Sequence, residues 1–480
     1  MALFYRPQDG VAADFIPFYW KGEYHLFYLK DYRDPQGHGE GTPWFHLATR
    51  DFVHFEDWGE ALPRGTAADQ DLYVFTGSVI ERQGVFHIFY TGHNPHMRQQ
   101  GQAEQGVMHA TSTDLRTWTK DTVFKSFAPL DHGYEAHDWR DPFVFWNAAA
   151  GEYWMLLAAR KQTGPSRQRG LTARMASPDL VHWELRTPFW APDLYYTHEC
   201  PDLFRIDDWW YLVYSTFSER CVTHYRMSRS LDGPWLAPGN DTFDGRAYYA
   251  AKTAGDGQRR FIFGWLPTRS GEKDDGDWNW GGNLVVHELV QQADGLLTVK
   301  APETVTNALQ QRLPVTSQAM LGSWKVASGK ITGGMAGRAA STMLLDLPAA
   351  CRIEMELTFT PGTASFGLLL RADAGLDHYY QLRFEPANQR MVFDRWPRPG
   401  DQPFMLERPL ALAPDKPVKL LVLLDETCVV AYAGDQALCC RLYEHHSGKL
   451  GLFANEGEVH FSHVTAASVY DVTTISSTLT

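Results

Sequence analysis

The amino-acid sequence predicts an all-β protein in which a five-bladed β-propeller is followed by a β-sandwich. Aromatic residues make up 14% of the 480 residues, a composition that favours strands. A turn followed by alternating aromatic and aliphatic residues recurs five times before residue 270, and shorter alternating strands follow. Because one hydrophobic core rarely serves more than roughly 250–300 residues, we expect two domains.

The five repeats predict the blades of the propeller. They begin at Gly22, Gly84, Gly151, Asp208 and Gly257, and each runs into an apolar strand such as Glu-Tyr-His-Leu-Phe-Tyr. Their starts lie 49 to 67 residues apart, which is wider than common propeller repeats but fits four-stranded blades with long loops. We therefore expect a five-bladed propeller over residues 1–298.

A short helix is expected to link the two domains. The segment 299–314 carries Pro302 near its start, and proline is favoured in the first turn of a helix. Beyond it, segments such as 351–359 and 365–371 alternate polar and apolar residues between turns rich in Pro, Gly and Asp. This pattern predicts a β-sandwich over residues 315–480.

Charge and cysteine content narrow the possible partners. The net charge of −13 and the lack of a basic run argue against nucleic acid, and no apolar stretch approaches the roughly 18 residues of a membrane span. The six cysteines lack metal-ligand spacing, so we expect reduced thiols and neither a metal nor a cofactor. The first residues show no export signal, which favours a cytoplasmic protein acting on a small neutral molecule.

Three acidic residues hold similar places in the repeats. Asp141 lies in a Trp-Arg-Asp-Pro motif, and Glu199 lies 58 residues later in a His-Glu-Cys-Pro motif. Asp14, Asp141 and Glu199 precede the turn residues of their repeats by 8, 10 and 9 residues. Since the innermost strands of a propeller start near its central channel, the three acids are predicted to share one site.

Other side chains are expected around this site. The second repeat offers Thr76 and Ser78 at the equivalent place, the fifth offers Tyr249, and Arg140 adjoins Asp141. Taken singly, each acid also fits a turn or a strand cap, and Arg140 equally fits a surface position. Three acids in register favour a site, because an isolated carboxylate beside apolar strands is costly to desolvate.

Such a group of carboxylates is what cleavage of a glycosidic bond requires. One carboxylic acid with a raised pKa protonates the leaving oxygen, while an ionised partner attacks the anomeric carbon or activates water. A third acid can bind sugar hydroxyls, and an arginine can hold a carboxylate or donate to a hydroxyl. The residues thus indicate a carbohydrate-cleaving enzyme.

The motifs resemble those of glycoside hydrolase family 32, the invertase, levanase and inulinase group. Trp-Arg-Asp-Pro at 139–142 and Glu-Cys-Pro-Asp-Leu-Phe at 199–204 carry the resemblance. It extends in order to Phe-Thr-Gly-Ser at 75–78, to 248–253 and to Trp-Gly-Gly-Asn at 280–283. The resemblance also implies the five-bladed propeller followed by the sandwich.

The resemblance implies roles for individual residues. It makes Glu199 the general acid/base, Asp141 the transition-state stabiliser and Asp14 the nucleophile of a retaining mechanism. Trp44 matches the region of the family's sugar-pocket tryptophan. The predicted substrate-binding residues are Arg140, Trp44, Phe75, Thr76, Ser78, Tyr249 and Trp280.

The chain departs from the family pattern around Asp14. The usual Asn-Asp-Pro-Asn-Gly is replaced by Ala-Asp-Phe-Ile-Pro at 13–17, and the family's Gln after the strand is replaced by Leu29. Asp9 is a rival for the nucleophile, but it lies 13 residues before Gly22, too far back to start the same strand. These departures from the family motif weaken what the resemblance implies about the substrate more than what it implies about the reaction.

The expected function is cleavage of terminal β-fructofuranosyl bonds in small fructosides or fructo-oligosaccharides, with retention. One alternative on the same fold is an arabinofuranosidase-like hydrolase, and another is a fructosyltransferase, which would use the same residues. A sugar-binding protein without activity is the alternative from another class, because a fold alone does not fix a function.

Overall fold

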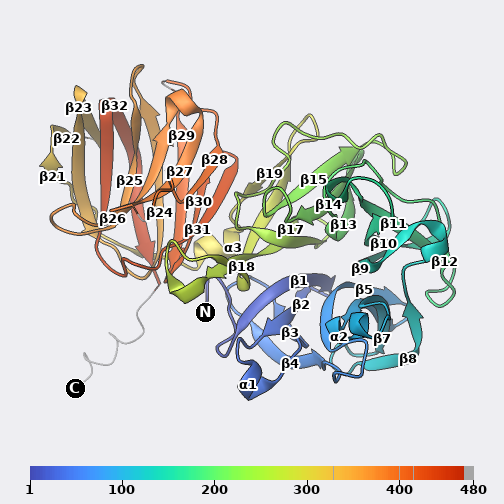
Figure 1. Cartoon of the computed structure of the whole chain (residues 1–480). Helices are drawn as coiled ribbons and strands as arrows, with labels where there is room; N and C mark the ends of the chain where they lie inside the picture. Colours follow the sequence, from blue (N-terminus) through green and yellow to red (C-terminus); the bar gives the residue numbers. More distant parts are fainter. Residues whose placement is uncertain (328, 399, 415, 470–480) are drawn as a thin grey trace.

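The computed structural model describes residues 1–327, 329–398, 400–414 and 416–469, and its described part is almost entirely β-structure. Figure 1 shows a propeller, coloured blue to green, beside a sandwich coloured orange. The predicted fold class is therefore confirmed. No helix in the described ranges is long and apolar enough to cross a membrane.

The propeller has five blades. Blade I comprises β1 (Val11–Trp20), β2 (Glu23–Asp31), β3 (Trp44–Thr49) and β4 (Glu56–Leu62). Blade II comprises β5 (Tyr73–Arg82), β6 (Val85–His93), β7 (Gln105–Ser112) and β8 (Thr119–Ser126). Blade III comprises β9 (Tyr134–Asn147), β10 (Glu152–Lys161), β11 (Gly170–Ser177) and β12 (Glu184–Leu185).

Of the last two blades, only blade IV differs from the four-stranded pattern that the repeats predict. Blade IV has three strands in its sheet, β13 (Glu199–Ile206), β14 (Trp209–Thr216) and β15 (Val222–Ser228). Blade V comprises β16 (Tyr249–Gly255), β17 (Arg260–Arg269), β18 (Trp278–Gln291) and β19 (Leu297–Lys300). In blade IV, single bridges from Met227 to Leu236 and from His224 to Thr242 stand where a fourth strand would lie.

Tight turns explain why the repeats are visible in the sequence. Lys21 and Gly22 both have positive φ, 49° and 90°, and so do Gln83 and Gly84, 53° and 83°. Two successive residues in the left-handed region form the turn that matches the twist of a β-hairpin. Each such turn joins the first and second strands of a blade, which is where the repeated motif begins.

The ring closes between its first and last blades. The innermost strands β1, β5, β9, β13 and β16 contact one another in that order, and β16 contacts β1. Blades I and V also share a sheet, through the pairing of Ala12 in β1 with Gly282 in β18. A Cβ atom at Gly282 would lie 1.9 Å from the carbonyl oxygen of Leu266, so this position requires glycine.

The segment between the domains is shorter than expected. Blade V runs to Lys300, and the helix α3 covers only Glu303–Asn307. The strand β20 (Gln311–Arg312) already pairs with β32 of the sandwich. Residues 299–314 therefore divide among the last propeller strand, one helical turn and the first strand of the sandwich.

The sandwich is built around one long strand, β32 (Lys449–Ser468). The first half of β32 pairs with β25 (Ser365–Ala372) and the second half with β24 (Ala350–Phe359). The other strands are β21 (Gln318–Leu321), β22 (Trp324–Ala327), β23 (Lys330–Asp346), β26 (Tyr379–Glu385), β27 (Arg390–Trp396), β28 (Leu406–Pro409), β29 (Val418–Asp425), β30 (Cys428–Ala433) and β31 (Gln436–Arg441). The six cysteines are all free thiols, as expected, and five are buried.

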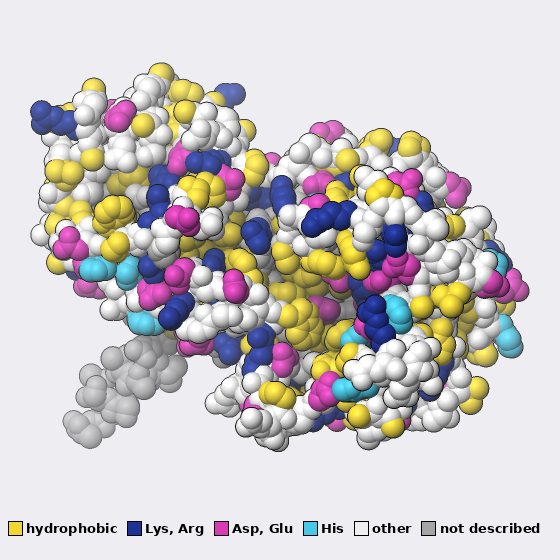
Figure 2. Space-filling model, viewed as in Figure 1, with side chains coloured by type: hydrophobic (Ala, Val, Ile, Leu, Met, Phe, Trp, Pro, Cys, Tyr) yellow, Lys and Arg dark blue, Asp and Glu magenta, His cyan; other side chains and the backbone are white. Residues whose placement is uncertain are grey.

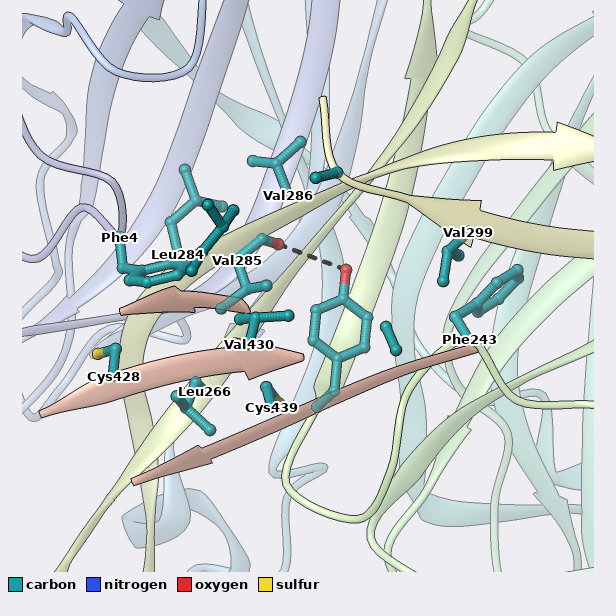
Figure 3. Close-up of a cluster of buried hydrophobic side chains, with 14 of the residues drawn as sticks. Phe4, Phe243, Leu266, Leu284, Val285, Val286, Val299, Cys428, Val430 and Cys439 are labelled. Carbon is teal, nitrogen blue, oxygen red and sulfur yellow. Dashed lines mark hydrogen bonds between the residues drawn. The ribbon is translucent and has the colours of Figure 1, made fainter. Parts of the chain in front are cut away.

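The two domains share one hydrophobic core. Figure 3 shows Leu266 and Leu284 of the propeller packed near Cys428, Val430 and Cys439 of the sandwich, and these residues belong to one cluster of buried side chains. The sandwich therefore packs directly on β17 and β18 of the closing blade.

Buried polar contacts also join the domains. The side chain of Asp274, in the loop between β17 and β18, is 0% exposed. It accepts hydrogen bonds from the Tyr443 backbone N–H (2.8 Å), the Tyr380 hydroxyl (2.6 Å) and the Arg395 guanidinium (3.0 Å). All three donors belong to the sandwich domain, so this propeller loop is anchored in the other domain.

Candidate active site

A register shift of the β-bulge type interrupts the innermost strand of every blade, and β9 has a second one. At these shifts Asp14, Asp141, Cys200 and Ala250 have positive φ, between 42° and 59°. A bulge bends its strand and changes the direction of a side chain. The bulges therefore turn polar side chains of several blades toward the central channel.

The bulges correct the equivalence that the sequence spacing indicates. Asp141 lies in the bulge of β9, at the place that Cys200 occupies in β13. Glu199 is the residue before the bulge, equivalent to Arg140 in blade III and to Tyr249 in blade V. The two acids thus occupy adjacent positions of the repeat, because the segment between bulge and turn differs in length between blades.

A cavity of about 520 Å³ lies at the centre of the propeller. Figure 2 shows acidic, basic and hydrophobic side chains together around the hollow on this face. The predicted site residues that line the cavity are Asp14, Phe75, Arg140, Asp141, Glu199, Tyr249 and Trp280. The structure therefore brings the three acids into one site.

Asp14 is held by two donors from neighbouring strands. The Thr76 hydroxyl donates to one carboxylate oxygen at 2.6 Å and the Trp265 indole to the other at 2.9 Å. Burial and the nearby charges of Asp141 and Glu199 raise the pKa of Asp14 to about 7. The two donors oppose this rise, because they stabilise the ionised form.

Glu199 is arranged to hold a proton. Its carboxyl accepts hydrogen bonds from the Tyr249 hydroxyl and from Arg140, the latter at 3.1 Å. Burial, and then the charge of Asp141, raise the pKa of Glu199 above the usual range, although Arg140 opposes the shift. A carboxyl of raised pKa beside an open cavity can donate a proton to a substrate.

Asp141 is held mainly by the backbone. One carboxylate oxygen accepts the Cys200 backbone N–H at 2.9 Å, and the backbone N–H of Asp141 donates to the Thr91 hydroxyl at 2.7 Å. Burial raises the pKa of Asp141, while the Arg140 charge, 3.8 Å away, favours its ionised form. The carboxylate is therefore fixed in direction.

Arg140 is the cation at the centre of the group. It is 7% exposed, so the alternative of a surface arginine is wrong. Its guanidinium also contacts Asp138 at 2.6 Å and the Gln105 side chain at 3.2 Å. The surrounding carboxylates raise the pKa of Arg140, so it stays charged.

Three predicted substrate-binding residues lie behind the cavity wall. Trp44 is 0% exposed, donates its indole N–H to the Phe75 carbonyl at 3.2 Å and does not line the cavity. Thr76 is 0% exposed and reaches the site only through Asp14. Ser78 accepts the Val144 backbone N–H at 2.9 Å, which links blades II and III.

The rival acid lies away from the site. Asp9 pairs with Lys30 at 2.6 Å, its side chain is 57% exposed, and it does not line the central cavity. Sequence reasoning also missed cavity residues, among them Trp265, Asp138 and Gln105. Trp265 ends the fifth copy of the repeat, so its place in the repeat was a usable signal, whereas Gln105 lies at the start of a third strand without a motif.

Within the described residues, no group of three or more His, Cys, Asp or Glu side chains is arranged to hold a metal ion. The polar side chains that line the cavity include carboxylates, three arginines (Arg98, Arg140 and Arg246), His137, Tyr196 and Tyr249. A propeller that presents an acid of raised pKa near two further carboxylates belongs to the class of glycoside hydrolases.

The chain belongs to glycosyl hydrolases family 32. The model of the family's N-terminal domain matches residues 6–297, and that of its C-terminal domain matches residues 327–468. The resemblance of the motifs is thereby confirmed.

Known proteins are similar to the chain along much of its length. A sucrose-6-phosphate hydrolase of Vibrio alginolyticus is 25% identical, covering 62% of this chain and 62% of that protein. Another, from Bacillus subtilis (strain 168), is 29% identical and covers 52% of this chain and 53% of that protein. The chain thus spans about half to two thirds of these curated relatives.

Solved structures share the fold. The exo-inulinase of Aspergillus awamori superimposes with a TM-score of 0.74 at 19% identity, covering 98% of this chain and 99% of that chain. The propeller and the sandwich are therefore both represented in known structures.

Proposed function

We propose that this chain hydrolyses terminal β-fructofuranosyl bonds of small fructosides or fructo-oligosaccharides with retention of configuration. The observation that carries the proposal is the convergence of Asp14, Asp141 and Glu199 on one cavity, with Arg140 among them. Membership of family 32 supports the reaction class, and the names of the relatives support a fructoside substrate.

The first step breaks the glycosidic bond. Glu199 gives its proton to the glycosidic oxygen, and the ionised Asp14 attacks the anomeric carbon. The bond to the leaving group breaks with its electron pair on the protonated oxygen, and an ester between Asp14 and the fructosyl group forms. The raised pKa of Glu199 supplies the proton that this step needs.

The second step reverses these roles. Glu199, now ionised, takes a proton from water, and the water oxygen attacks the anomeric carbon. The ester bond breaks, Asp14 leaves as a carboxylate, and fructose is released. Thr76 and Trp265 favour the ionised form of Asp14 that the first step requires, and they stabilise the carboxylate that leaves in the second step.

Asp141 and Arg140 act on the sugar and on the acids. Positive charge develops on the fructosyl ring in each transition state, and the buried carboxylate of Asp141 stabilises it. Arg140 contacts both Asp141 and Glu199, so its positive charge offsets the repulsion between these two carboxylates.

Product analysis tests the reaction. Early time points by NMR on a panel of fructofuranosides and arabinofuranosides should show fructose of retained configuration. Release of arabinose alone, an inverted product, or no release from any member would overturn the proposal. A product with a second sugar in place of water would identify a fructosyltransferase.

The role of Glu199 has its own test. Glu199→Gln should lower kcat about 10³-fold on natural fructosides, because the leaving oxygen is no longer protonated. A fructoside with an acidic phenol as leaving group needs little protonation, so its first step should be much less affected. An equal loss on both substrates would contradict the acid role.

A further inference from the structure

Asp138 is a carboxylate of the catalytic cavity to which the proposed reaction gives no role. It lines the cavity, and its side chain is 13% exposed. It lies in β9 two residues before Arg140, a spacing at which side chains of a strand point to the same face. It accepts a hydrogen bond from the Arg140 guanidinium at 2.6 Å, which is shorter than the contacts of Arg140 with Glu199 (3.1 Å) and Asp141 (3.8 Å).

The guanidinium of Arg140 is divided between two sets of partners. Its Nη1 atom donates to Asp138 and, at 3.2 Å, to the Gln105 side chain. Its Nη2 atom donates to Glu199, and its Nε atom faces Asp141. The donors of an arginine have fixed directions in one plane, so partners on Nη1 fix the direction of the other nitrogens. Asp138 and Gln105 therefore aim Arg140 at the two catalytic acids.

A second arginine holds Asp138 in place. The carboxylate oxygen that does not bind Arg140 lies 3.4 Å from the Nε atom of Arg160. Arg160 is 2% exposed, pairs with Glu135 at 2.8 Å and donates to the Ser166 carbonyl at 3.1 Å. Asp138 thus bridges two buried guanidinium groups, one facing the cavity and one behind it.

The contact between Arg140 and Glu199 has two opposing effects on acid catalysis. It orients the carboxyl, but an arginine beside a carboxyl favours the ionised form, whereas a general acid must hold a proton. Burial raises the pKa of Glu199, and Arg140 opposes this rise. The negative charge of Asp138 on the other side of the same guanidinium offsets part of its positive charge. Arg140 can then orient Glu199 without removing the proton that the first step needs.

The other titratable groups around Glu199 and Arg140 do not reverse this effect. Burial shifts the pKa values of four of them so that they are neutral near pH 7: Cys200, Cys221 and Tyr249 are shifted upward and His93 downward. The acids that face Glu199 are Asp14 and Asp141. The remaining titratable groups that line the cavity are Arg98, Glu104, His137, Tyr196 and Arg246. Loss of the charge of Asp138 lowers the pKa of every nearby carboxyl, because less negative charge then surrounds it.

We propose that Asp138 is a positioning residue that holds Arg140 from the side opposite Glu199 and limits how strongly this arginine binds the general acid. The inference rests on the proposed function, because it gives Asp138 a part in the delivery of the Glu199 proton. Asp138 acts through Arg140 and takes part in no bond-making step. A carboxylate that served stability alone would leave the acidity of Glu199 unchanged when its charge is removed.

The titration of Glu199 tests the proposal. Its carboxyl carbon is followed by ¹³C NMR in protein labelled on glutamate, and the signal is assigned by its loss in Glu199→Gln. Asp138→Asn keeps the shape and a hydrogen-bond acceptor but removes the charge, so the pKa of Glu199 should fall by about one pH unit. Asp138→Glu keeps the charge and should leave the pKa of Glu199 within about 0.3 pH units of the wild type.

Glu135→Gln is the matched control. Glu135 also pairs with Arg160, but its other partner is Arg169, and it does not line the cavity. The control removes one charge from the same group of arginines and should leave the pKa of Glu199 in place. An unchanged pKa of Glu199 in Asp138→Asn, or an equal fall in the control, would overturn the proposal.

Kinetics provide a second measurement. The pH optimum of kcat/KM lies midway between the two apparent pKa values of the catalytic acids, so it should move down by about half a pH unit in Asp138→Asn. On the alkaline side of the optimum, this variant should lose about tenfold in kcat/KM on sucrose. The loss should be much smaller on a fructoside with an acidic phenol as leaving group, which needs little protonation. An equal loss on both substrates would contradict the proposal.

The NMR titration separates this proposal from the proposed function. A lower pKa of Glu199 in Asp138→Asn supports the effect of Asp138 on the acid even if the wild type releases no fructose. Release of fructose with retained configuration, together with an unchanged pKa of Glu199 in the variant, overturns the role of Asp138 and leaves the proposed reaction standing.

Discussion

The catalytic cavity and the domain interface both contain buried carboxylates, but the surroundings of these carboxylates differ. At the interface Asp274 receives three donors from the sandwich, and its side chain is 0% exposed. In the cavity Asp14 is near the charges of Asp141 and Glu199, only the latter two contact Arg140, and all three acids face about 520 Å³ of space. Burial alone does not mark a functional acid; incomplete compensation beside an open cavity does.

The largest expected effect is the loss of activity when an acid of the catalytic cavity is replaced. Asp14→Asn should lower kcat by about 10⁴-fold, because the nucleophile is lost. Its thermal midpoint should not fall, since removing one of three mutually repelling acids relieves strain in the folded state. Asp9→Asn is the control, with activity and midpoint unchanged. Activity lost in the control instead of in Asp14→Asn would reassign the nucleophile.

The converse change acts on the interface. Asp274→Ala should cost about 3–5 kcal/mol of unfolding free energy, because Arg395 and the Tyr380 hydroxyl lose their buried partner. Urea unfolding measures the loss, and Asp275→Ala, at an exposed neighbour, should cost little. A loss no larger than that of the control would remove the contrast between the two regions.

A smaller change sharpens the account of the cavity. Thr76→Val removes the hydroxyl that donates to Asp14, which disfavours the ionised form and raises its pKa beyond about 7. A hydrogen bond to a charged group contributes about 1.5–3 kcal/mol. In a plot of kcat/KM against pH, the apparent pKa on the acidic side should therefore rise by about one to two pH units. Thr76→Ser keeps the donor and should leave this apparent pKa in place.

A further effect, a dependence of stability on pH, concerns blade I, away from both regions. His25 and His46 lie in contact, with their ring nitrogens 3.0 Å apart, and burial lowers the pKa of His25 to about 4 and that of His46 to about 2. Both are neutral when folded but bind protons when unfolded below about pH 6.5. Stability should therefore fall between about pH 6.5 and 4.

Each of these histidines contributes about 1.4 kcal/mol for each pH unit below its unfolded pKa. Thermal unfolding as a function of pH measures the slope. His46→Phe should make it shallower, because one titrating group is gone. An unchanged slope would mean that other groups set the acid limit.

The sequence allows the blades to be predicted because each depends on neighbours in the chain. Gly22 and Gly84 form turns within a hairpin, so the repeat that they start is local and visible. The hydrogen bond between Asp274 and Arg395 joins residues 121 positions apart in the chain. No motif in the sequence around either residue predicts this contact. Contacts across domains follow from packing that no short motif encodes.

The candidate site was only partly predictable for a related reason. Asp14, Asp141 and Glu199 could be placed near the channel from their distance to a turn, but the one-residue offset between Asp141 and Glu199 depends on bulges. For Trp44, too, the sequence motif does not give the direction of the side chain. Its motif is clear, yet its pairing with Leu29 in the sheet turns the side chain into the core.

The closure of the ring by Ala12 and Gly282 also orders events during translation. Ala12 leaves the ribosome long before the residue with which it pairs, so the edge of β1 facing blade V stays open until β18 is complete. β18 also carries part of the surface on which the sandwich packs. The same strand therefore completes the propeller ring and provides the surface for packing of the sandwich. A nascent chain stalled before Gly282 would offer chaperones an unclosed ring rather than a finished domain.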